Sequence, residues 1–163
     1  MNLYNRKLYN LDKKVTQWMA KNGLKLLRIS LGIIFTWYGA LKFFEGLSPA
    51  ESFAIETIDT MFFGIIPEDV IIYGLATWET LIGLGLLFKI FMRGTLLLLF
   101  AQMLGTFTPI FLLPEKVFVS IPFVLTIEGQ YIFKNLVVIS AAIVLGATVR
   151  GARIDIEDEE PKE

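Results

Sequence analysis

The chain has 163 residues, of which 55% are hydrophobic and 19% are charged, and its mean hydropathy is +0.61. Soluble globular domains carry more charge, so the composition excludes an ordinary soluble domain and predicts one small integral membrane domain. The sequence contains no cysteine and no histidine, which excludes thiol–disulfide chemistry and the haem, iron–sulfur or metal sites that depend on those ligands. Its net charge of -1 conceals a strong segregation of basic from acidic residues.

Residues 1–23 form a basic N-terminal segment without an apolar core, so we do not expect a cleavable secretory signal. Between Leu11 and Met19, apolar residues recur at helical spacing while lysines fall on the opposite side. This pattern predicts a short amphipathic helix that lies on the membrane surface, is attracted to anionic lipid and ends at Asn22 and Gly23. The alternative is a solvated leader that only marks the topology.

Four apolar segments follow, and each has about the 20 residues that a helix needs to cross a bilayer. They lie at residues 24–44, 70–88, 94–113 and 131–149. We therefore predict an all-α polytopic membrane protein in which residues 24–150 form a four-helix transmembrane bundle with short amphipathic interfacial helices.

Charged residues divide the connections into two kinds. Basic residues precede the first span, lie between the second and third at Lys89 and Arg93, and follow the fourth at Arg150 and Arg153. The other two connections are mostly acidic, so the positive-inside rule predicts that both termini are cytoplasmic. Residues 151–163 form an acidic tail that we expect to be disordered. Because the basic residues follow membrane topology, we expect no nucleic-acid binding.

The first acidic connection opens with a helix-start signal. Ser48 is a typical N-cap, Pro49 suits the first helical position, and Glu51 completes a capping box. The sequence predicts an interfacial helix at about residues 48–63 that lies flat over the outer face of the bundle as a lid. Its apolar stripe comprises Ala54, Ile58, Met61, Phe62 and Ile65.

The second acidic connection, residues 114–130, is unusually apolar for a loop. A segment of this composition does not sit free in water. We expect it to fold into the outer membrane surface or down onto the bundle.

Glu79 is the strongest candidate for a functional residue. It lies near mid-bilayer in the second span, where an ionisable side chain costs about 2.5 to 3.5 kcal/mol on insertion scales. Ala76 and Gly83 share its stripe and suit close approach of another helix. Two interpretations follow: a carboxyl group that holds or relays a proton, or a structural carboxyl group that sets the helix register.

Lys42 shares a helical stripe with Gly32 and Gly39, which directs it into the bundle, but its position near the outer boundary also suits snorkelling to water. Lys134 has the same ambiguity. An ion pair of Lys42 with Glu79 would bridge an axial offset of about 9 Å and would need both long side chains or a water. The alternating topology predicts an outward-facing polar cavity formed by Lys42, Glu79, Gln102, Thr106, Lys134 and Asn135, with Trp37, Tyr38 and Trp78 as aromatic walls.

Three short motifs carry a resemblance to a known family. The first motif belongs to the first span and comprises Arg28 to Phe35, Trp37-Tyr38-Gly39 and Lys42-Phe43, followed by Ser48-Pro49-Ala50. The second is the Glu-x-x-x-Gly segment within Trp78 to Leu87 in the second span. The third is Gly129 to Leu136 in the fourth span, which contains Lys134-Asn135. Together they resemble the DoxX-like membrane proteins over about residues 25–150, most closely the branch containing the reactive-chlorine-resistance membrane protein. The disulfide chemistry of some relatives needs cysteines that this chain lacks.

The resemblance implies a four-helix bundle in a prokaryotic cytoplasmic (inner) membrane, which in some members is a subunit of a thiosulfate:quinone oxidoreductase and in others is linked to oxidative or sulfur stress. It makes a quinone a candidate cofactor, and a redox protein or a second copy of the chain a candidate partner. Two other functions remain open: a structural protein whose polar cluster only sets helix packing, and a small proton or solute carrier.

Overall fold

A computed structural model describes residues 3–48, 51–149 and 151. Four helical segments are long and apolar enough to cross a membrane, and the protein is a multi-pass, all-α membrane protein. They are α1 (Leu3–Leu41), α3 (Glu68–Phe88), α4 (Met92–Phe107) with α5 (Pro109–Leu112), and α7 (Ile127–Thr148). The shorter elements are α2 (Glu51–Met61), α6 (Pro114–Val117), β1 (Phe118–Ser120) and β2 (Val124–Leu125). The predicted tail lies, apart from Gly151, outside the described residues.

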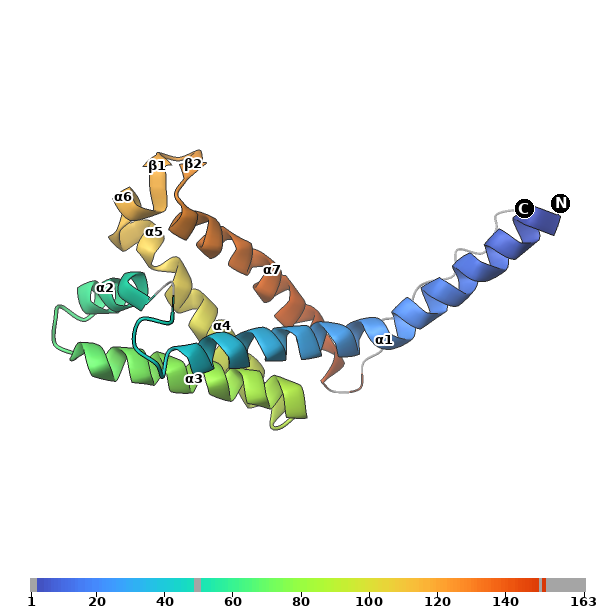
Figure 1. Cartoon of the computed structure of the whole chain (residues 1–163), viewed down its shortest axis with the longest axis horizontal. Coiled ribbons are helices and arrows are strands. Elements are labelled where there is room, and N and C mark those ends of the chain that lie inside the picture. The colour runs from blue at the N-terminus through green and yellow to red at the C-terminus, as the bar shows by residue number, and fades with distance from the viewer. Residues whose placement is uncertain (1–2, 49–50, 150, 152–163) are drawn as a thin grey trace.

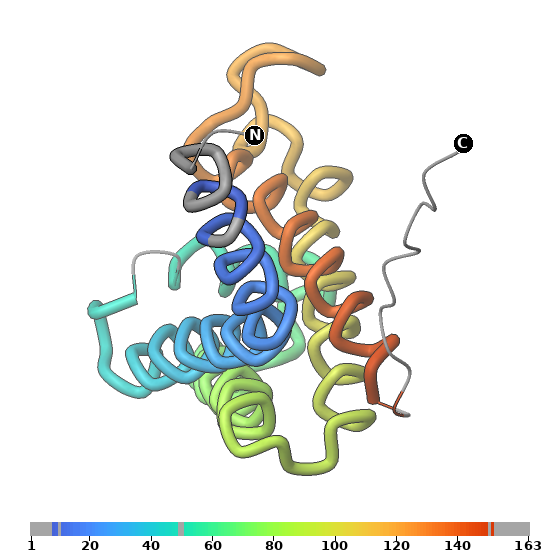
Figure 2. Tube along the Cα trace, turned by 90° about the vertical axis from the view of Figure 1, so that its right-hand side faces the viewer, coloured from blue at the N-terminus to red at the C-terminus, as the bar shows by residue number. Residues whose placement is uncertain are grey.

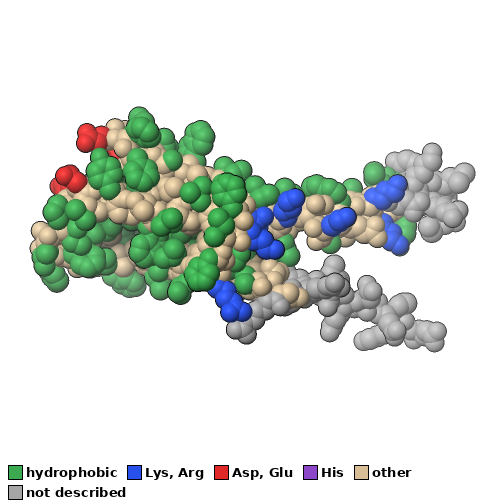
Figure 3. Space-filling view, turned by 90° about the horizontal axis from the view of Figure 1, so that it is seen from below, with side chains coloured by type: hydrophobic (Ala, Val, Ile, Leu, Met, Phe, Trp, Pro, Cys, Tyr) green, Lys and Arg blue, Asp and Glu red, His purple; other side chains and the backbone are tan. Residues whose placement is uncertain are grey.

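The bundle has two ends of opposite charge. We call the end where α1 finishes and α3 begins the acidic end, because the connections there carry Glu45, Glu56, Asp69 and Glu115. The opposite, basic end carries Lys89 in the turn from α3 to α4 and adjoins the lysines of α1. Figure 3 shows this separation, with apolar side chains covering the face between the ends. An apolar belt between two charged ends is the surface that a bilayer requires.

Helix α1 differs from the sequence prediction at both ends. It runs without interruption through Asn22 and Gly23, and its N-terminal part extends away from the bundle (Figure 1). One glycine costs a helix only about 1 kcal/mol, so the helix-forming residues on either side carry it through. The Asn22 side chain donates to Trp18 O within the helix instead of ending it. At the acidic end, α1 stops at Leu41, three residues before the predicted Phe44.

Helices α1 and α3 pack antiparallel with their backbones close together. A Cβ atom at Gly39 would lie 2.7 Å from the backbone nitrogen of Thr80, and one at Gly83 would collide with Thr36. Small residues on both helices therefore set this interface, as is common between membrane helices. Figure 2 shows α1 lying over α3, and α4 running beside α7.

Arg28 joins α1 to α3 at the basic end. Its Nη1 donates to Leu87 O at 2.9 Å and also to Leu86 O. These carbonyls belong to the last turn of α3, where no helical N–H follows to satisfy them. A guanidinium group there also complements the negative end of the helix dipole.

The hydrophobic core joins all four spans in the half of the bundle toward the basic end. Ile82, Leu86 and Leu99 are fully buried at its centre. The other buried members are Leu31, Phe35, Leu96, Met103, Ala141, Ala142 and Leu145. Residues on the outward faces, such as Leu97 and Val137, are mostly exposed, as lipid-facing positions are.

Helix α2 fills the space where the α1/α3 and α4/α7 pairs diverge toward the acidic end (Figure 1). Its described part is Glu51–Met61, and it ends before the predicted residue 63, because Phe63 and Gly64 both have positive φ. At the predicted helix start, residues 49–50 lie outside the described residues.

The third span is interrupted, whereas the sequence predicted one helix over residues 94–113. Pro109 has no N–H to donate to Gly105 O. That carbonyl instead accepts from Thr108 N at 3.1 Å and from Thr108 Oγ1 at 2.8 Å. Helix α4 therefore ends at Phe107, and the short α5 begins at Pro109.

The apolar connection at 114–130 folds into α6 and a two-stranded antiparallel sheet of β1 and β2. Val117 is fully buried and anchors the segment to the bundle. Helix α7 then begins at Ile127, four residues before the predicted Tyr131, because Thr126 acts as its N-cap and accepts from Gly129 N at 3.0 Å.

Candidate functional site

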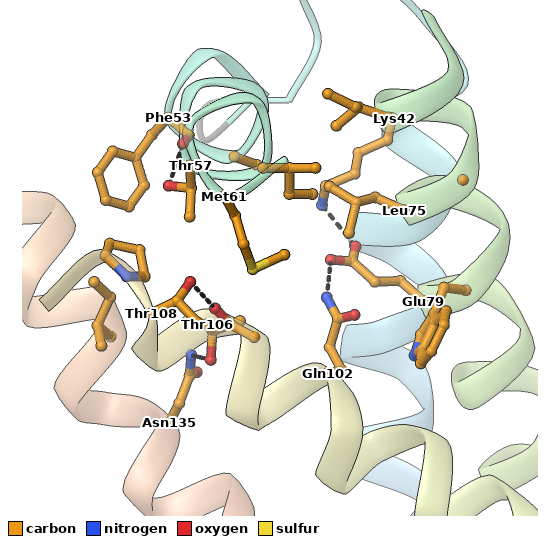
Figure 4. A pocket seen from close by; sticks show the side chains of 18 of the residues that line it. Lys42, Phe53, Thr57, Met61, Leu75, Glu79, Gln102, Thr106, Thr108 and Asn135 are labelled. Carbon is orange, nitrogen blue, oxygen red and sulfur yellow. Dashed lines mark hydrogen bonds and ion pairs between the residues drawn. The ribbon is translucent and has the colours of Figure 1, made fainter. Parts of the chain in front are cut away.

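A cavity of about 560 Å³ lies at the acidic half of the bundle. Helix α2 covers it, α3, α4, α5 and α7 form its walls, and Lys42 reaches it from the end of α1. Most of its lining is apolar, including Phe53, Ala54, Ile58, Met61, Ile71, Leu75, Pro109 and Ile132. The polar lining residues fall into two groups on opposite sides, and Met61 projects between them (Figure 4).

The first polar group consists of Lys42, Glu79 and Gln102. Lys42 Nζ lies 2.6 Å from Glu79 Oε2, and Gln102 Nε2 donates to Glu79 Oε1 at 3.0 Å. The side chains of Lys42 and Glu79 are only 8% and 13% exposed. Three spans thus meet at one carboxylate, with both of its oxygens satisfied. The sequence predicted these residues for the cavity and left open whether Lys42 and Glu79 meet directly or through a water; the structure shows the direct contact.

The close packing of α1 on α3 explains this contact. Lys42 lies one helical turn beyond Gly39, and Glu79 precedes Thr80, which Gly39 contacts. With no Cβ between the backbones, the lysine side chain meets the carboxylate without a bridging water. The structure therefore places Lys42 inside the bundle and not in the snorkelling orientation.

The second polar group joins α4 to α7. Asn135 Nδ2 donates to Thr106 Oγ1 at 3.2 Å, and Thr106 Oγ1 donates to Met103 O at 2.8 Å. Both residues line the cavity, as the sequence predicted, on the side away from Glu79 (Figure 4).

Lys134 belongs to neither polar group. It lines the cavity but is exposed, and its ammonium lies 5.0 Å from the ring centre of Tyr131, close enough for a cation–π contact. Glu128 is a second exposed lining residue from the same helix. The cavity lining thus contains two lysines and two glutamates, so its formal charges cancel.

Two of the three predicted aromatic walls are wrong. Trp37 and Tyr38 are 65% and 52% exposed and do not line the cavity. Trp37 is two residues from Gly39, and at about 100° per residue this puts it on roughly the opposite side of the helix from the α3 contact at Gly39. Only Trp78 lines the cavity, and its indole N–H donates to Leu98 O of α4 at 3.1 Å.

The sequence reasoning missed Thr57 and Phe53 of α2. Thr57 is buried over the cavity and donates to Phe53 O at 2.7 Å, which satisfies its hydroxyl within the helix. A signal was present, because Thr57 lies three residues after Ala54 and four before Met61 and so shares their stripe.

In the part of the chain that the structure describes, no group of three or more histidine, cysteine, aspartate or glutamate residues is arranged to hold a metal ion. Comparison with family models, with curated proteins and with solved structures found no match. The arrangement of the site therefore carries the functional argument.

Proposed function

We propose that this protein binds a quinone, or a similar lipophilic molecule with oxygen acceptors, in the cavity under α2, and serves a redox or oxidative- or sulfur-stress system as a DoxX-like membrane component. The observation that carries the proposal is the state of Lys42. Its ammonium has three N–H donors, and Glu79 is its one recorded partner among the described residues. A buried ammonium beside a cavity favours a further oxygen acceptor there, since unmade hydrogen bonds are costly.

The charges of the cavity lining favour a neutral ligand over an anion. The formal charges of the cavity lining cancel, and most of the lining is apolar. An anion would lose its hydration here without a net positive charge to receive it. A neutral ring with carbonyl oxygens suits these walls better, with Lys42 and Gln102 as donors and Trp78 beside the ring.

Electron transfer would need a partner. The sequence has no cysteine and no histidine, so its side chains supply no thiol couple and no imidazole ligand. A bound quinone would carry the electrons, and the protein would position it and supply hydrogen bonds. A redox protein, or a second copy of this chain, would complete the system.

The proposal includes an orientation in a prokaryotic inner membrane, with both termini cytoplasmic and the cavity facing outward. The separation of charge in Figure 3 supports it by the positive-inside rule. Because the chain has no cysteine, a single introduced cysteine reports the accessibility of its own position without background labelling. An impermeant maleimide should label Ser120→Cys in intact cells and label Lys89→Cys only after lysis. The reverse pattern would overturn the orientation.

Binding is tested with duroquinone, a benzoquinone without a tail, by quenching of Trp78 fluorescence in a Trp18→Phe/Trp37→Phe background. We expect saturable quenching, and affinity reduced by about tenfold or more in Lys42→Met/Glu79→Leu, because a hydrogen bond to a charged donor is worth about 1.5 to 3 kcal/mol. The matched control is Lys116→Met, which removes a lysine outside the cavity lining. Absence of saturable quenching in the parent protein, or equal affinity in the double variant, contradicts the proposal.

One observation favours a second candidate, a structural protein whose polar cluster only sets packing. Both oxygens of Glu79 are already satisfied by Lys42 and Gln102, so the carboxylate needs no ligand. This candidate predicts that Lys42→Met alone lowers the unfolding temperature in detergent. It also predicts that duroquinone changes the unfolding temperature of neither this variant nor the parent protein. Stabilisation of the parent protein by duroquinone would exclude it.

A further inference from the structure

A second cavity of about 560 Å³ adjoins the first on the outer side of α3 and α4. Tyr73, Thr77, Leu81 and Leu98 line it, and we call it the α3/α4 groove. It contains Asp69 at the acidic end of α3, so it follows that helix inward from the acidic end.

The two cavities share one wall. Val70, Gly74 and Trp78 line both of them. At Gly74 this wall has no side chain, and an added Cβ atom there would meet no atom within 4 Å. Val70 and Trp78 lie on either side of Gly74 along the helix, and the hydrogen bond from Trp78 to Leu98 O holds the indole across the junction of α3 and α4.

The α3/α4 groove opens on the apolar belt. Leu81, within the span of α3, is 55% exposed, and Tyr73, nearer the acidic end of the same helix, is 46% exposed. The Thr77 hydroxyl donates to Tyr73 O at 2.8 Å and is satisfied within its helix. Apart from the Asp69 carboxylate at the acidic end and the Tyr73 phenol, the groove presents mainly carbon to its surroundings. A surface of this kind at bilayer depth faces hydrocarbon.

We propose that the ligand is an amphiphile with a hydrocarbon tail: its head lies beside Lys42, and its tail leaves past Gly74 and Trp78 along the α3/α4 groove into the lipid. The inference rests on the proposed function, because it needs a head in the first cavity. It adds the substrate class, a tailed lipid-soluble quinone or like molecule, and the side from which the molecule enters. Such a ligand reaches the site without leaving the bilayer.

The test uses a benzoquinone with a decyl chain that ends in a photoreactive diazirine, bound to the full protein in lipid nanodiscs. After illumination, mass spectrometry locates the label. We expect the label on residues of the α3/α4 groove, and an excess of duroquinone should remove at least nine-tenths of it. A label on α1, α2 or α7 that duroquinone displaces would place the tail elsewhere and overturn the inference.

Thr77→Trp fills the α3/α4 groove with a side chain that the first cavity does not contact. We expect it to weaken decyl-quinone binding by about tenfold or more, and duroquinone binding by less than about twofold. Leu97→Trp is the matched control, since Leu97 is 70% exposed on the same belt and lines neither cavity. Equal affinity of Thr77→Trp and Leu97→Trp for the decyl-quinone would overturn the inference.

Different results would contradict the proposed function and the inference about the tail. If duroquinone does not bind, the proposed function fails and the inference fails with it. If duroquinone binds, but a decyl chain labels no groove residue and Thr77→Trp does not discriminate between the two quinones, the inference alone fails.

Discussion

Among the residues that the structure describes, two lysine–glutamate pairs are alike in chemistry and opposite in surroundings. Lys42 and Glu79 are 8% and 13% exposed between two spans, whereas Lys116 and Glu56 are 45% and 40% exposed where α6 meets α2. An exposed pair gains little, because water and salt screen its charges. A buried pair is costly to form, and breaking it leaves an uncompensated charge. Burial, and not the ion pair itself, decides which of the two pairs the fold depends on.

Breaking the buried pair from one side should have the largest effect. Lys42→Met leaves Glu79 without its cation, and we expect it to lower the free energy of unfolding in detergent by about 3 to 5 kcal/mol. Lys42→Met/Glu79→Leu should recover most of that loss, since apolar replacements of a buried pair are often neutral. Unfolding followed by circular dichroism measures both. If Lys42→Met were as stable as the parent protein, the fold would not depend on the buried pair.

Gln102, the third member of the buried polar group, should contribute less to stability than Lys42. Gln102→Leu removes the donor to Glu79 Oε1, and we expect a loss of about 1.5 to 3 kcal/mol, the worth of a hydrogen bond to a charged group. Gln17→Leu on the exposed part of α1 is the control and should stay within about 0.5 kcal/mol. The same unfolding measurement applies, and equal losses in the two variants would show that Gln102 does not support the carboxylate.

The close approach of α1 and α3 should also be needed to keep the pair buried. Gly39→Ala puts a Cβ atom 2.7 Å from the nitrogen of Thr80, and overpacking of this kind costs about 1 to 3 kcal/mol. Gly105→Ala is the control, because its Cβ atom would meet nothing within 4 Å. Its stability should be unchanged or higher by about 0.5 to 1 kcal/mol, since alanine suits a helix better than glycine. Thermal unfolding of the two variants side by side measures both effects on stability.

The exposed pair should show the smallest effect. Lys116→Met is expected to cost less than about 1 kcal/mol, because both partners remain in contact with water. Whatever loss occurs should shrink as the salt concentration rises toward 1 M, where the Debye length is about 3 Å. Unfolding curves at low and high salt test this. A loss as large as that of Lys42→Met would mean that the contact of α2 with α6 holds the fold together.

Local patterns in the sequence were sufficient for the fold class, the number of spans, the segregation of charge and the part of the α2 stripe formed by Ala54, Ile58 and Met61. Each depends on residues close together in the chain, whose composition and spacing determine what a bilayer will accept. The predicted stripe members Phe62 and Ile65 lie beyond the end of α2 and are exposed. The same patterns singled out Glu79 as the costly residue of its span. They were misleading at Gly23 and Pro109, where the competition between a glycine or proline and its helical neighbours decided the outcome.

Only the tertiary structure decided what Lys42 contacts. Its two candidate orientations had equal support in the sequence, and the glycine-mediated approach of α1 to α3 selected one of them. Tertiary packing likewise turned Trp37 and Tyr38 outward and placed Trp78 between two cavities. These outcomes depend on the rotation and spacing of whole helices. A shift of a few ångströms in that packing changes which side chains meet, although it leaves every local pattern in the sequence intact.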